Sequence, residues 1–293
     1  MTKCGYVAII GRPNVGKSTL LNTLIGQKIS IISSKPQTTR QQILGIQTIQ
    51  SVQIIYIDTP GLHHAGKRAI NRYMNRLASA VIPDANAVLF MIEATRFHEE
   101  DERILQQISN YSVPVILVIN KIDKLKDKKL ILPLIEQYKE KFNFLHIVPI
   151  SAERAENIDS LQKTLISLMP EGPYLFPEEQ ITDKDLSFQA AEIIREKLIR
   201  LTGQELPYST TVVVESIKEQ NNLLNINAVI WVEREGQKPI VIGKAGERLK
   251  KIGTAARKEI VKLIGKKIFL RLWVKVKSDW TDDERALGSL GLK

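Results

Sequence analysis

The sequence has 293 residues, of which 43% are hydrophobic, and this length and composition predict two domains that each bury a core of ordinary size. A single cysteine, Cys4, excludes an internal disulfide, and no run approaches the ~18 apolar residues of a membrane-spanning helix, so a reducing, cytoplasmic location is expected. The formal net charge is +10, and its confinement to one segment near the C-terminus points to an acidic partner for that segment.

Residues 1–169 alternate apolar strand-like runs with amphipathic helix-like runs. This pattern predicts an α/β domain with a mostly parallel sheet covered on both faces. Strands are predicted at 6–10, 41–49, 52–57, 87–92, 115–119 and 145–149, and helices are predicted after residues 17, 68, 99, 127 and 157. The second and third strands have no helix between them, so they are expected to form an antiparallel pair at a sheet edge.

The first strand leads into Gly-Arg-Pro-Asn-Val-Gly-Lys-Ser at residues 11–18. The spacing Gly-x4-Gly-Lys-Ser turns backbone N–H groups toward phosphate oxygens, and the next helix adds the positive end of its dipole. Lys17 can then reach the β- and γ-phosphates, while the Ser18 hydroxyl can ligate Mg2+. The residues predicted to hold a nucleotide here are Asn14, Val15, Gly16, Lys17, Ser18 and Thr19.

A second motif, Asp58-Thr59-Pro60-Gly61, ends the third predicted strand. Asp58 can hold magnesium through water, and the N–H of Gly61 can contact a γ-phosphate. Such a contact exists only before hydrolysis, so it can report the nucleotide state. In isolation the same four residues also fit an ordinary turn.

A third motif, Asn120-Lys121-Ile122-Asp123, follows another buried strand. The Asp123 carboxylate can accept both the N1–H and the 2-amino hydrogens of guanine, a pair that adenine lacks. An unpaired carboxylate against adenine would be costly, so this residue predicts selectivity for guanine. Asn-Lys-x-Asp alone is common on lysine-rich surfaces, and the argument depends on all three motifs each following a predicted strand.

With these motifs the sequence resembles the Ras-like GTPases of the translation-factor group. Ser151-Ala152-Glu153 matches their fifth motif, which contacts the base. The family also places a magnesium-binding threonine in a mobile switch, for which Thr39 is favoured here and Thr38 is the alternative. The resemblance implies GTP hydrolysis with Lys17, Thr39 and Gly61 as the catalytic positions. It implies Ser18, Thr39 and Asp58 as the Mg2+ ligands.

Two positions bear on the hydrolysis mechanism. Many GTPases carry a glutamine after the switch glycine to orient the attacking water, but this chain has Leu62 there. Slow intrinsic hydrolysis is therefore expected, unless backbone groups or a partner hold the water. Asn14 matches family members that use K+ as a fixed charge near the phosphates, and a simple cap of the loop is the equally open alternative.

Proline and glycine residues then mark a linker at 170–185, and a second domain is predicted at 186–293. Its expected elements are a helix near 186–202, strands near 210–218 and 223–235, a basic helix near 246–264 and a strand near 267–277. Residues 241–277 contain 12 Lys and Arg against two Glu, and the rest of the chain balances 30 cations with 30 acids. A solvated helix face is the alternative that charge alone leaves open.

Within that basic segment lies Gly243-Lys244-Ala245-Gly246, a Gly-x-x-Gly loop. With Val-Ile-Gly before it, a cationic helix after it and flanking strands, the segment resembles a KH domain of the prokaryotic type (type II, α+β), which clamps about four nucleotides of a single strand. The residues expected to contact RNA are Ile242, Gly243, Lys244, Ala245, Gly246, Arg248, Lys250 and Lys251. Leu249 and Ile242 are expected to give unstacked bases an apolar floor.

A Ras-like P-loop GTPase domain, a linker and a C-terminal KH domain together resemble a family of bacterial GTPases. The resemblance implies GTP/GDP binding, contact with single-stranded 16S-type rRNA near the 3′ end, and a role in maturation of the small (30S) ribosomal subunit. It further implies a monomer with weak peripheral membrane contact. The residues alone leave two other classes open, a membrane or trafficking switch and an RNA-binding protein with a vestigial nucleotide fold.

Overall fold

The computed structural model describes residues 1–293 except 34, 36–37, 63–67, 203–205 and 291–293. The contacts divide the chain into two compact units. The first contains residues 1–30, 39–66 and 71–183, and the second contains residues 31–38, 67–70 and 184–293. Two short segments near the N-terminal half therefore group with the C-terminal part of the chain. The segment 31–38, as far as it is described, is called the strap below.

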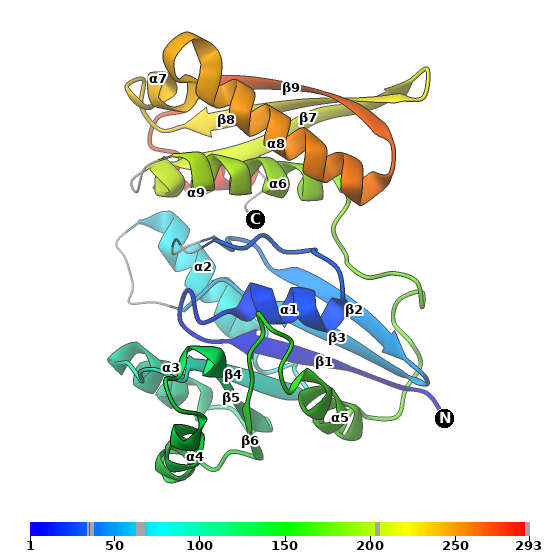
Figure 1. The fold of residues 1–293 in the computed structure, drawn as a ribbon, viewed down its shortest axis with the longest axis vertical. Helices are drawn as coiled ribbons and strands as arrows, with labels where there is room; N and C mark the ends of the chain where they lie inside the picture. The colour runs from blue at the N-terminus through cyan, green and yellow to red at the C-terminus, as the bar shows by residue number, and fades with distance from the viewer. Residues whose placement is uncertain (34, 36–37, 63–67, 203–205, 291–293) are drawn as a thin grey trace. The chain divides into compact units, whose positions relative to one another are not determined.

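The first unit contains a six-stranded sheet with the order β2-β3-β1-β4-β5-β6 (Figure 1). Its strands are β1 (Lys3–Ile10), β2 (Ile43–Ile49), β3 (Val52–Asp58), β4 (Ala87–Glu93), β5 (Val115–Asn120) and β6 (His146–Pro149). Among the described strands of this sheet only the β2–β3 pair is antiparallel, and it lies at an edge of the sheet. The predicted parallel sheet with one antiparallel edge pair is confirmed.

The helices of this unit are α1 (Lys17–Ile25), α2 (Ala69–Ala80), α3 (Glu99–Ile108), α4 (Ile131–Lys139) and α5 (Ile158–Leu168), and the short turns are η1 (Ile122–Lys124) and η2 (Lys128–Leu130). The first two residues of α2 group with the second unit. Apolar residues of α2, α3 and α4 share one core cluster with alternating residues of the strands. Helices α1 and α5 pack against β3. Because strands β1, β4 and β5 are buried along nearly their whole length, their sequences read as continuous apolar runs.

The segment predicted as a linker runs along the sheet of the first unit. The N–H of Ile46 donates to the carbonyl of Ile181 at 2.9 Å, and the N–H of Leu44 donates to Asp183 Oδ1 at 3.0 Å. Gln53, fully buried, accepts the Phe176 N–H on its side-chain oxygen at 3.0 Å. These contacts hold much of the segment against β2 and β3.

The second unit contains a three-stranded sheet with the order β7-β8-β9. Its elements are α6 (Leu186–Leu201), η3 (Leu206–Ser209), β7 (Thr210–Gln220), β8 (Leu223–Val232), α7 (Gln237–Ile242), η4 (Lys244–Gly246), α8 (Glu247–Ile264), β9 (Lys267–Val276) and α9 (Glu284–Ser289). The predicted order of helix, strand, strand, basic helix and strand is confirmed. The six-residue helices α7 and α9 were not predicted, because so short a helix shows less than two turns of apolar periodicity.

One face of this sheet carries the core of the unit. Alternate residues of β8 and β9, such as Ile226, Ile230 and Val274, join a cluster with residues of α6 and α8. In β9 the remaining alternate residues point to the opposite face, and five of them are exposed: Lys267, Phe269, Arg271, Trp273 and Lys275. None of the helices in the described ranges is both long enough and apolar enough to cross a bilayer.

The strap is tied to helix α6. The ammonium of Lys35 donates to the carbonyls of Ile199 and Thr202, at 2.6 and 2.7 Å. The guanidinium of Arg195 donates to the carbonyl of Thr38 and is itself almost fully buried. The two bonds from Lys35 satisfy carbonyls at the C-terminal end of α6 with a cation, which suits the negative end of the helix dipole.

Candidate nucleotide site and nucleic-acid groove

The loop at residues 11–18 connects β1 to α1 at the carboxyl edge of the sheet. Gly16 has φ 104° immediately before α1, and a Cβ there would collide with the side-chain amide of Asn120. Lys17 is buried, and its Nζ donates to the carbonyls of Gly11 at 2.9 Å and Arg12 at 3.0 Å. Burial lowers the Lys17 pKa to about 8, an effect that the charge of Asp58 only partly opposes.

Next to this loop, two hydroxyl groups and a carboxylate meet. Ser18 Oγ donates to Asp58 Oδ2 at 2.6 Å and lies 2.9 Å from Thr39 Oγ1. Ser30 Oγ donates to the same carboxylate oxygen at 3.1 Å. The neighbouring Thr38 instead donates its hydroxyl to the carbonyl of Lys35 at 2.6 Å. Of the two candidate threonines, Thr39 is the one that the fold brings to Ser18.

The carboxylate of Asp58 is the most buried charge of the cluster. Burial raises its pKa, although the hydrogen bonds from Ser18 and Ser30 and the charge of Lys17 act in the opposite direction. Its Oδ1 is buried and has no hydrogen-bond partner within the described part of the chain. An unpaired buried carboxylate oxygen is costly, and a cation or an ordered water at this point would satisfy it.

The residues after Asp58 approach the phosphate loop closely. A Cβ on Gly61 would lie only 2.6 Å from the backbone nitrogen of Pro13, so a glycine is needed there. The N–H of Leu62 donates to the carbonyl of Gly11 at 3.3 Å. Its side chain is 5% exposed and belongs to the apolar cluster under the sheet, so it points into the core rather than toward the loop.

At the other end of the site, one amide connects three motifs. Asn120 Nδ2 donates to the carbonyl of Val15 at 2.8 Å, and its Oδ1 accepts the N–H of Ala152 at 2.9 Å. Lys121, with φ 65°, donates its ammonium to the carbonyl of Asn14 at 2.6 Å. The phosphate loop, the Asn-Lys-x-Asp motif and the Ser-Ala-Glu motif are therefore held in one fixed arrangement.

The Asp123 carboxylate is held next to this arrangement. Its Oδ1 accepts the hydroxyl of Ser151 at 2.6 Å, and Arg154 approaches the other oxygen at 4.0 Å. The hydrogen bond from Ser151 lowers the Asp123 pKa, so the group is a carboxylate at neutral pH. Glu153, from the same loop, is exposed, and Thr19 lies on the first turn of α1. The predicted base-contacting residues thus lie within two adjacent loops.

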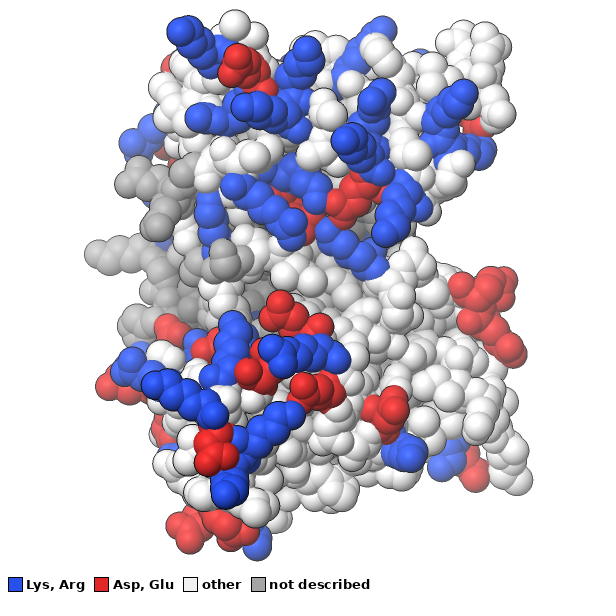
Figure 2. Space-filling view, viewed as in Figure 1, with Lys and Arg blue, Asp and Glu red and all other residues white. Residues whose placement is uncertain are grey.

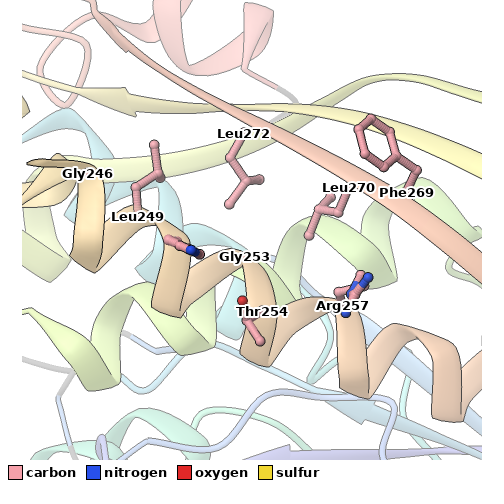
Figure 3. Close-up of a pocket in the computed structure, with 9 residues that line it drawn as sticks. Gly246, Leu249, Gly253, Thr254, Arg257, Phe269, Leu270 and Leu272 are labelled. Carbon is pink, nitrogen blue, oxygen red and sulfur yellow. The ribbon is translucent and has the colours of Figure 1, made fainter.

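In the second unit a groove of about 480 Å³ lies between α8 and β9 (Figure 3). It is lined by Gly246, Leu249, Lys250, Gly253, Thr254, Arg257, Phe269, Leu270 and Leu272. Leu270 and Leu272 point from β9 toward α8, whereas Phe269 lies on the other side of the strand at the rim. The groove thus has an apolar floor between a cationic helix and an exposed aromatic ring.

Three residues that the sequence singled out, Gly246, Leu249 and Lys250, line this groove. The residues of the expected RNA contact that do not line it are Ile242, Gly243, Lys244, Ala245, Arg248 and Lys251. Ile242 packs against the core, and the Arg248 guanidinium donates to the carbonyl of Ile240. Six lining residues from Gly253 onward were missed. The signal in α8 was the helical spacing from 246 to 257, but the β9 residues required the strand pairing to be known.

Lys and Arg side chains gather over the second unit on the face that presents α8 (Figure 2). Helix α8 starts at Glu247, directly after Gly246 with φ 80°, so the loop before it can adopt the left-handed turn that opens the helix. The concentration of positive charge on this face favours contact with an anionic partner.

Comparison with known proteins places both units. The family of 50S ribosome-binding GTPases matches residues 6–121, and the KH domain family matches residues 205–281. GTPase Era of Coxiella burnetii (strain Dugway 5J108-111) is 53% identical over 292 residues, which cover 100% of this chain and 99% of that protein. GTPase Era of Pseudomonas fluorescens (strain Pf0-1) is 51% identical over 290 residues, with 99% and 97% covered.

Two crystal structures agree with this match. Era in complex with MgGDPNP and nucleotides 1506–1542 of 16S ribosomal RNA has a TM-score of 0.97 and 46% identity, covering 100% of this chain and 99% of that chain. A variant of Aquifex aeolicus Era bound to GDP and AlF4− has a TM-score of 0.96 and 46% identity, with 99% of each chain covered. Taken with the site geometry, this similarity over the full length shows that the chain belongs to the GTPase Era family, with a Ras-like GTPase domain followed by a KH domain.

Proposed function

We propose that this GTPase is a switch that binds single-stranded RNA near the 3′ end of small-subunit rRNA in its GTP state and assists maturation of the small ribosomal subunit. The observation that carries the proposal is the groove between α8 and β9, which combines cations, an apolar floor and an aromatic rim. Support also comes from the similar Era that was crystallised with nucleotides 1506–1542 of 16S rRNA.

The groove offers each part of a nucleotide a matching surface. Lys250 and Arg257, about two helical turns apart on α8, would neutralise phosphates. Leu249 and Leu272 face each other across the floor and would accept unstacked bases, while Phe269 at the rim would stack on one. A Cβ at position 253 would lie 3.4 Å from Leu272 Cδ1, so any residue larger than Gly253 would narrow the groove.

The RNA proposal predicts a characteristic salt dependence. If about four phosphates of a single strand are neutralised, the log–log slope of affinity against salt should be about −3. Lys250→Ala should weaken binding and reduce that slope by roughly 0.7. Fluorescence anisotropy with a labelled oligonucleotide from the 1506–1542 stretch measures both quantities. Lys262→Ala is the matched control, because this exposed cation of α8 does not line the groove. A flat salt titration would refute RNA binding by the groove.

In the nucleotide site, we assign Mg2+ to the hydroxyls of Ser18 and Thr39 and the carboxylate of Asp58. These are hard oxygen donors, which magnesium prefers, and the unpaired buried Oδ1 of Asp58 favours a cation held directly or through water. When bound, the ion would neutralise charge that develops on the phosphates during transfer. The similar Era was crystallised with MgGDPNP.

The other residues of the nucleotide site divide between its phosphate end and its base end. The backbone of residues 14–19 and the Lys17 ammonium would hold the phosphates, and the Gly61 N–H would sense the γ-phosphate. Asp123 would read guanine, supported by Asn120, Lys121 and the loop at 151–153. Because the Leu62 side chain is buried in the core, it cannot orient the attacking water, so we expect a slow intrinsic rate.

We also propose that Asn14 binds K+. It has φ 65° at the exposed tip of the phosphate loop, and its carbonyl accepts the Lys121 ammonium, so the loop conformation is fixed around it. A cation there would add a positive charge near the phosphates. GTP hydrolysis should then be faster in KCl than in NaCl at equal ionic strength, and Asn14→Ala should remove the difference. Equal rates of the unsubstituted protein in both salts would favour the loop-cap interpretation.

The strap supplies a route for coupling between nucleotide and RNA. On its two sides, Ser30 bonds to Asp58 and Thr39 contacts Ser18, while the strap itself bonds to α6. A change at the γ-phosphate that moves Thr39 would therefore alter the strap's bonds to α6. Like the strap, the first residues of α2 group with the second unit and are hydrogen-bonded within it: the N–H of Ile70 donates to the carbonyl of Thr281 at 3.1 Å.

Coupling of this kind must be reciprocal, so RNA should change the affinity for GTP relative to GDP by the same factor as GTP changes RNA affinity. Lys35→Ala removes two strap bonds to α6 and should reduce that factor. Lys126→Ala, an exposed cation outside the strap, is the control. Calorimetry with GDP and a non-hydrolysable GTP analogue, with and without the RNA, measures the factor. Equal affinities in all four titrations would refute the coupling.

The resemblance further implies a monomer with weak peripheral membrane contact. Sedimentation equilibrium and flotation with anionic liposomes in the absence of RNA test these two expectations.

A further inference from the structure

The face of the β7-β8-β9 sheet opposite the core carries a second group of aromatic and cationic side chains. The strand pairing places Phe269, Arg271, Trp273 and Lys275 of β9 on this face, next to Asn225, Asn227, Val229 and Trp231 of β8. Phe269 and Trp273 are 44% and 42% exposed, although both are large apolar side chains. Helices α6 and α8 pack against the other face, where Leu270 and Leu272 point.

The cations on this face already lie over aromatic rings. The Arg271 guanidinium is 5.0 Å from the centroid of the Phe269 ring, and the Lys275 ammonium is 5.6 Å from that of Trp231. A planar guanidinium beside exposed rings is the combination on which unpaired bases stack in proteins that bind single strands. Lys218 of β7 pairs with Asn225 and therefore lies on the same face. Glu215, at the bulge of β7, forms an ion pair with Lys275, so among the described strand residues the cations of this face outnumber the carboxylates that contact them.

This face is continuous with the groove. Phe269 lines the groove at its rim and also belongs to the open face, because it projects from β9 on the side away from α8 (Figure 3). Same-face residues of a strand are about 6.6 Å apart, so the Phe269 and Trp273 Cα atoms are roughly 13 Å apart, with Arg271 between them. A strand of RNA leaving the groove over Phe269 would thus meet a guanidinium and then a second ring.

We propose that Phe269, Arg271 and Trp273 form a stacking platform for nucleotides that continue from the groove onto the open sheet face. The platform extends the single-stranded RNA site beyond the nucleotides held between α8 and β9. This inference rests on the proposed RNA-binding function. The occupant is single-stranded RNA rather than a duplex, because paired bases present only their edges and backbone to such rings.

The test compares RNA lengths. Pentanucleotides tiled across positions 1506–1542 of 16S rRNA identify the segment held by the groove, and the best of these is then extended by five nucleotides at either end. For the unsubstituted protein, one extended RNA should bind more tightly than the pentamer. Trp273→Ala should lose roughly 5- to 150-fold in affinity for that RNA, since base stacking on an aromatic side chain contributes this much. Its affinity for the pentamer should not change.

Conservative variants separate stacking from structure and charge. Trp273→Phe should retain the gain from extension because it keeps a ring, and Arg271→Lys should lose part of the gain because it keeps only the charge. Lys262→Ala, which removes one cation of α8 outside both surfaces, should leave the gain intact. Quenching of tryptophan fluorescence by the extended RNA should fall in Trp273→Phe, which leaves Trp231 as the remaining tryptophan of this face.

Each outcome decides one claim. If the pentamer binds but extension adds nothing, or if Trp273→Ala keeps the full gain, the platform is refuted while groove binding stands. If neither RNA binds the unsubstituted protein, the proposed function fails and the platform fails with it. If a hairpin extension gives the same Trp273-dependent gain as a single strand, the single-stranded occupant is wrong.

Discussion

Replacing Asp123 with asparagine should change which purine the GTPase recognises. The Asp123 side chain is 8% exposed and is fixed by the Ser151 hydroxyl at 2.6 Å, so water cannot readily replace a lost partner. In guanine, the N1–H and the 2-amino group both donate to this carboxylate. Xanthine has an oxygen in place of the 2-amino group, and this oxygen can accept a bond from an asparagine amide.

The size of the effect follows from the two bonds. Hydrogen bonds to a charged group contribute about 1.5–3 kcal/mol each, and the substitution removes two of them. The asparagine oxygen can still accept the N1–H as a weaker neutral bond, but its amide N–H groups then oppose the 2-amino donors of guanine, so the net cost is about 3–6 kcal/mol. Because about 1.4 kcal/mol corresponds to a factor of ten, GTP affinity should fall roughly 100- to 10,000-fold. XTP should bind Asp123→Asn better than GTP does, which reverses the preference of the unsubstituted protein.

Isothermal titration of nucleotide-stripped protein with GTP, ATP and XTP in the presence of magnesium measures this preference. Asp84→Asn removes one exposed carboxylate elsewhere in the same unit and should leave all three affinities unchanged. If Asp123→Asn keeps its GTP affinity, or gains none for XTP, the assignment of base recognition to this carboxylate is wrong.

Three further changes test the packing and the buried charges. Leu62→Gln should lower the free energy of unfolding, measured in urea, by about 1–3 kcal/mol, because the new amide enters the apolar core. The rate of phosphate release should not rise. Faster release would contradict the conclusion that this side chain packs in the core and does not orient water. Between pH 8 and 10.5 the folded chain holds fewer protons on Lys17 than the unfolded chain does. The free energy of unfolding of the nucleotide-free protein should therefore rise with pH over this range, by up to about 3 kcal/mol relative to Lys17→Met. Parallel pH profiles of the two proteins would contradict this. Trp280→Ala should lower the free energy of unfolding by about 3–5 kcal/mol, since the ring is fully buried and its N–H donates to the Ser209 carbonyl at 3.3 Å. Trp273→Ala should lower it far less, because the Trp273 ring is half exposed. Similar urea midpoints for the two variants would contradict this difference in packing.

The amino-acid sequence predicted the order of the strands and helices and the chemistry of the nucleotide site. The glycine-rich loop, Asp58 and the Asn-Lys-x-Asp motif each follow a buried apolar run. In a mostly parallel sheet the carboxyl ends of such runs meet at one edge. Local spacing was therefore sufficient to bring distant motifs together, and the structure places their side chains within hydrogen-bonding distance.

Other features depended on contacts that no local pattern encodes. Thr38 and Thr39 are chemically identical neighbours, and only the fold sends one hydroxyl to Ser18 and the other to the Lys35 carbonyl. Leu62 suggested a weak catalytic position, but its burial in the core became visible only in three dimensions.

The C-terminal unit shows the same division. Its charge and its Gly-x-x-Gly loop are properties of the sequence, because each lies within one short segment. The groove is lined both by Lys250 of α8 and by Leu272 of β9, so it forms only when these two elements pack together. The face of the sheet opposite the core depends on the pairing register that places Trp273 of β9 beside Val229 of β8. Sequence thus determined which chemistry each segment carries, while tertiary structure decided which segments share a surface, because pairing between distant strands and helices depends on packing of the whole domain rather than on neighbouring residues.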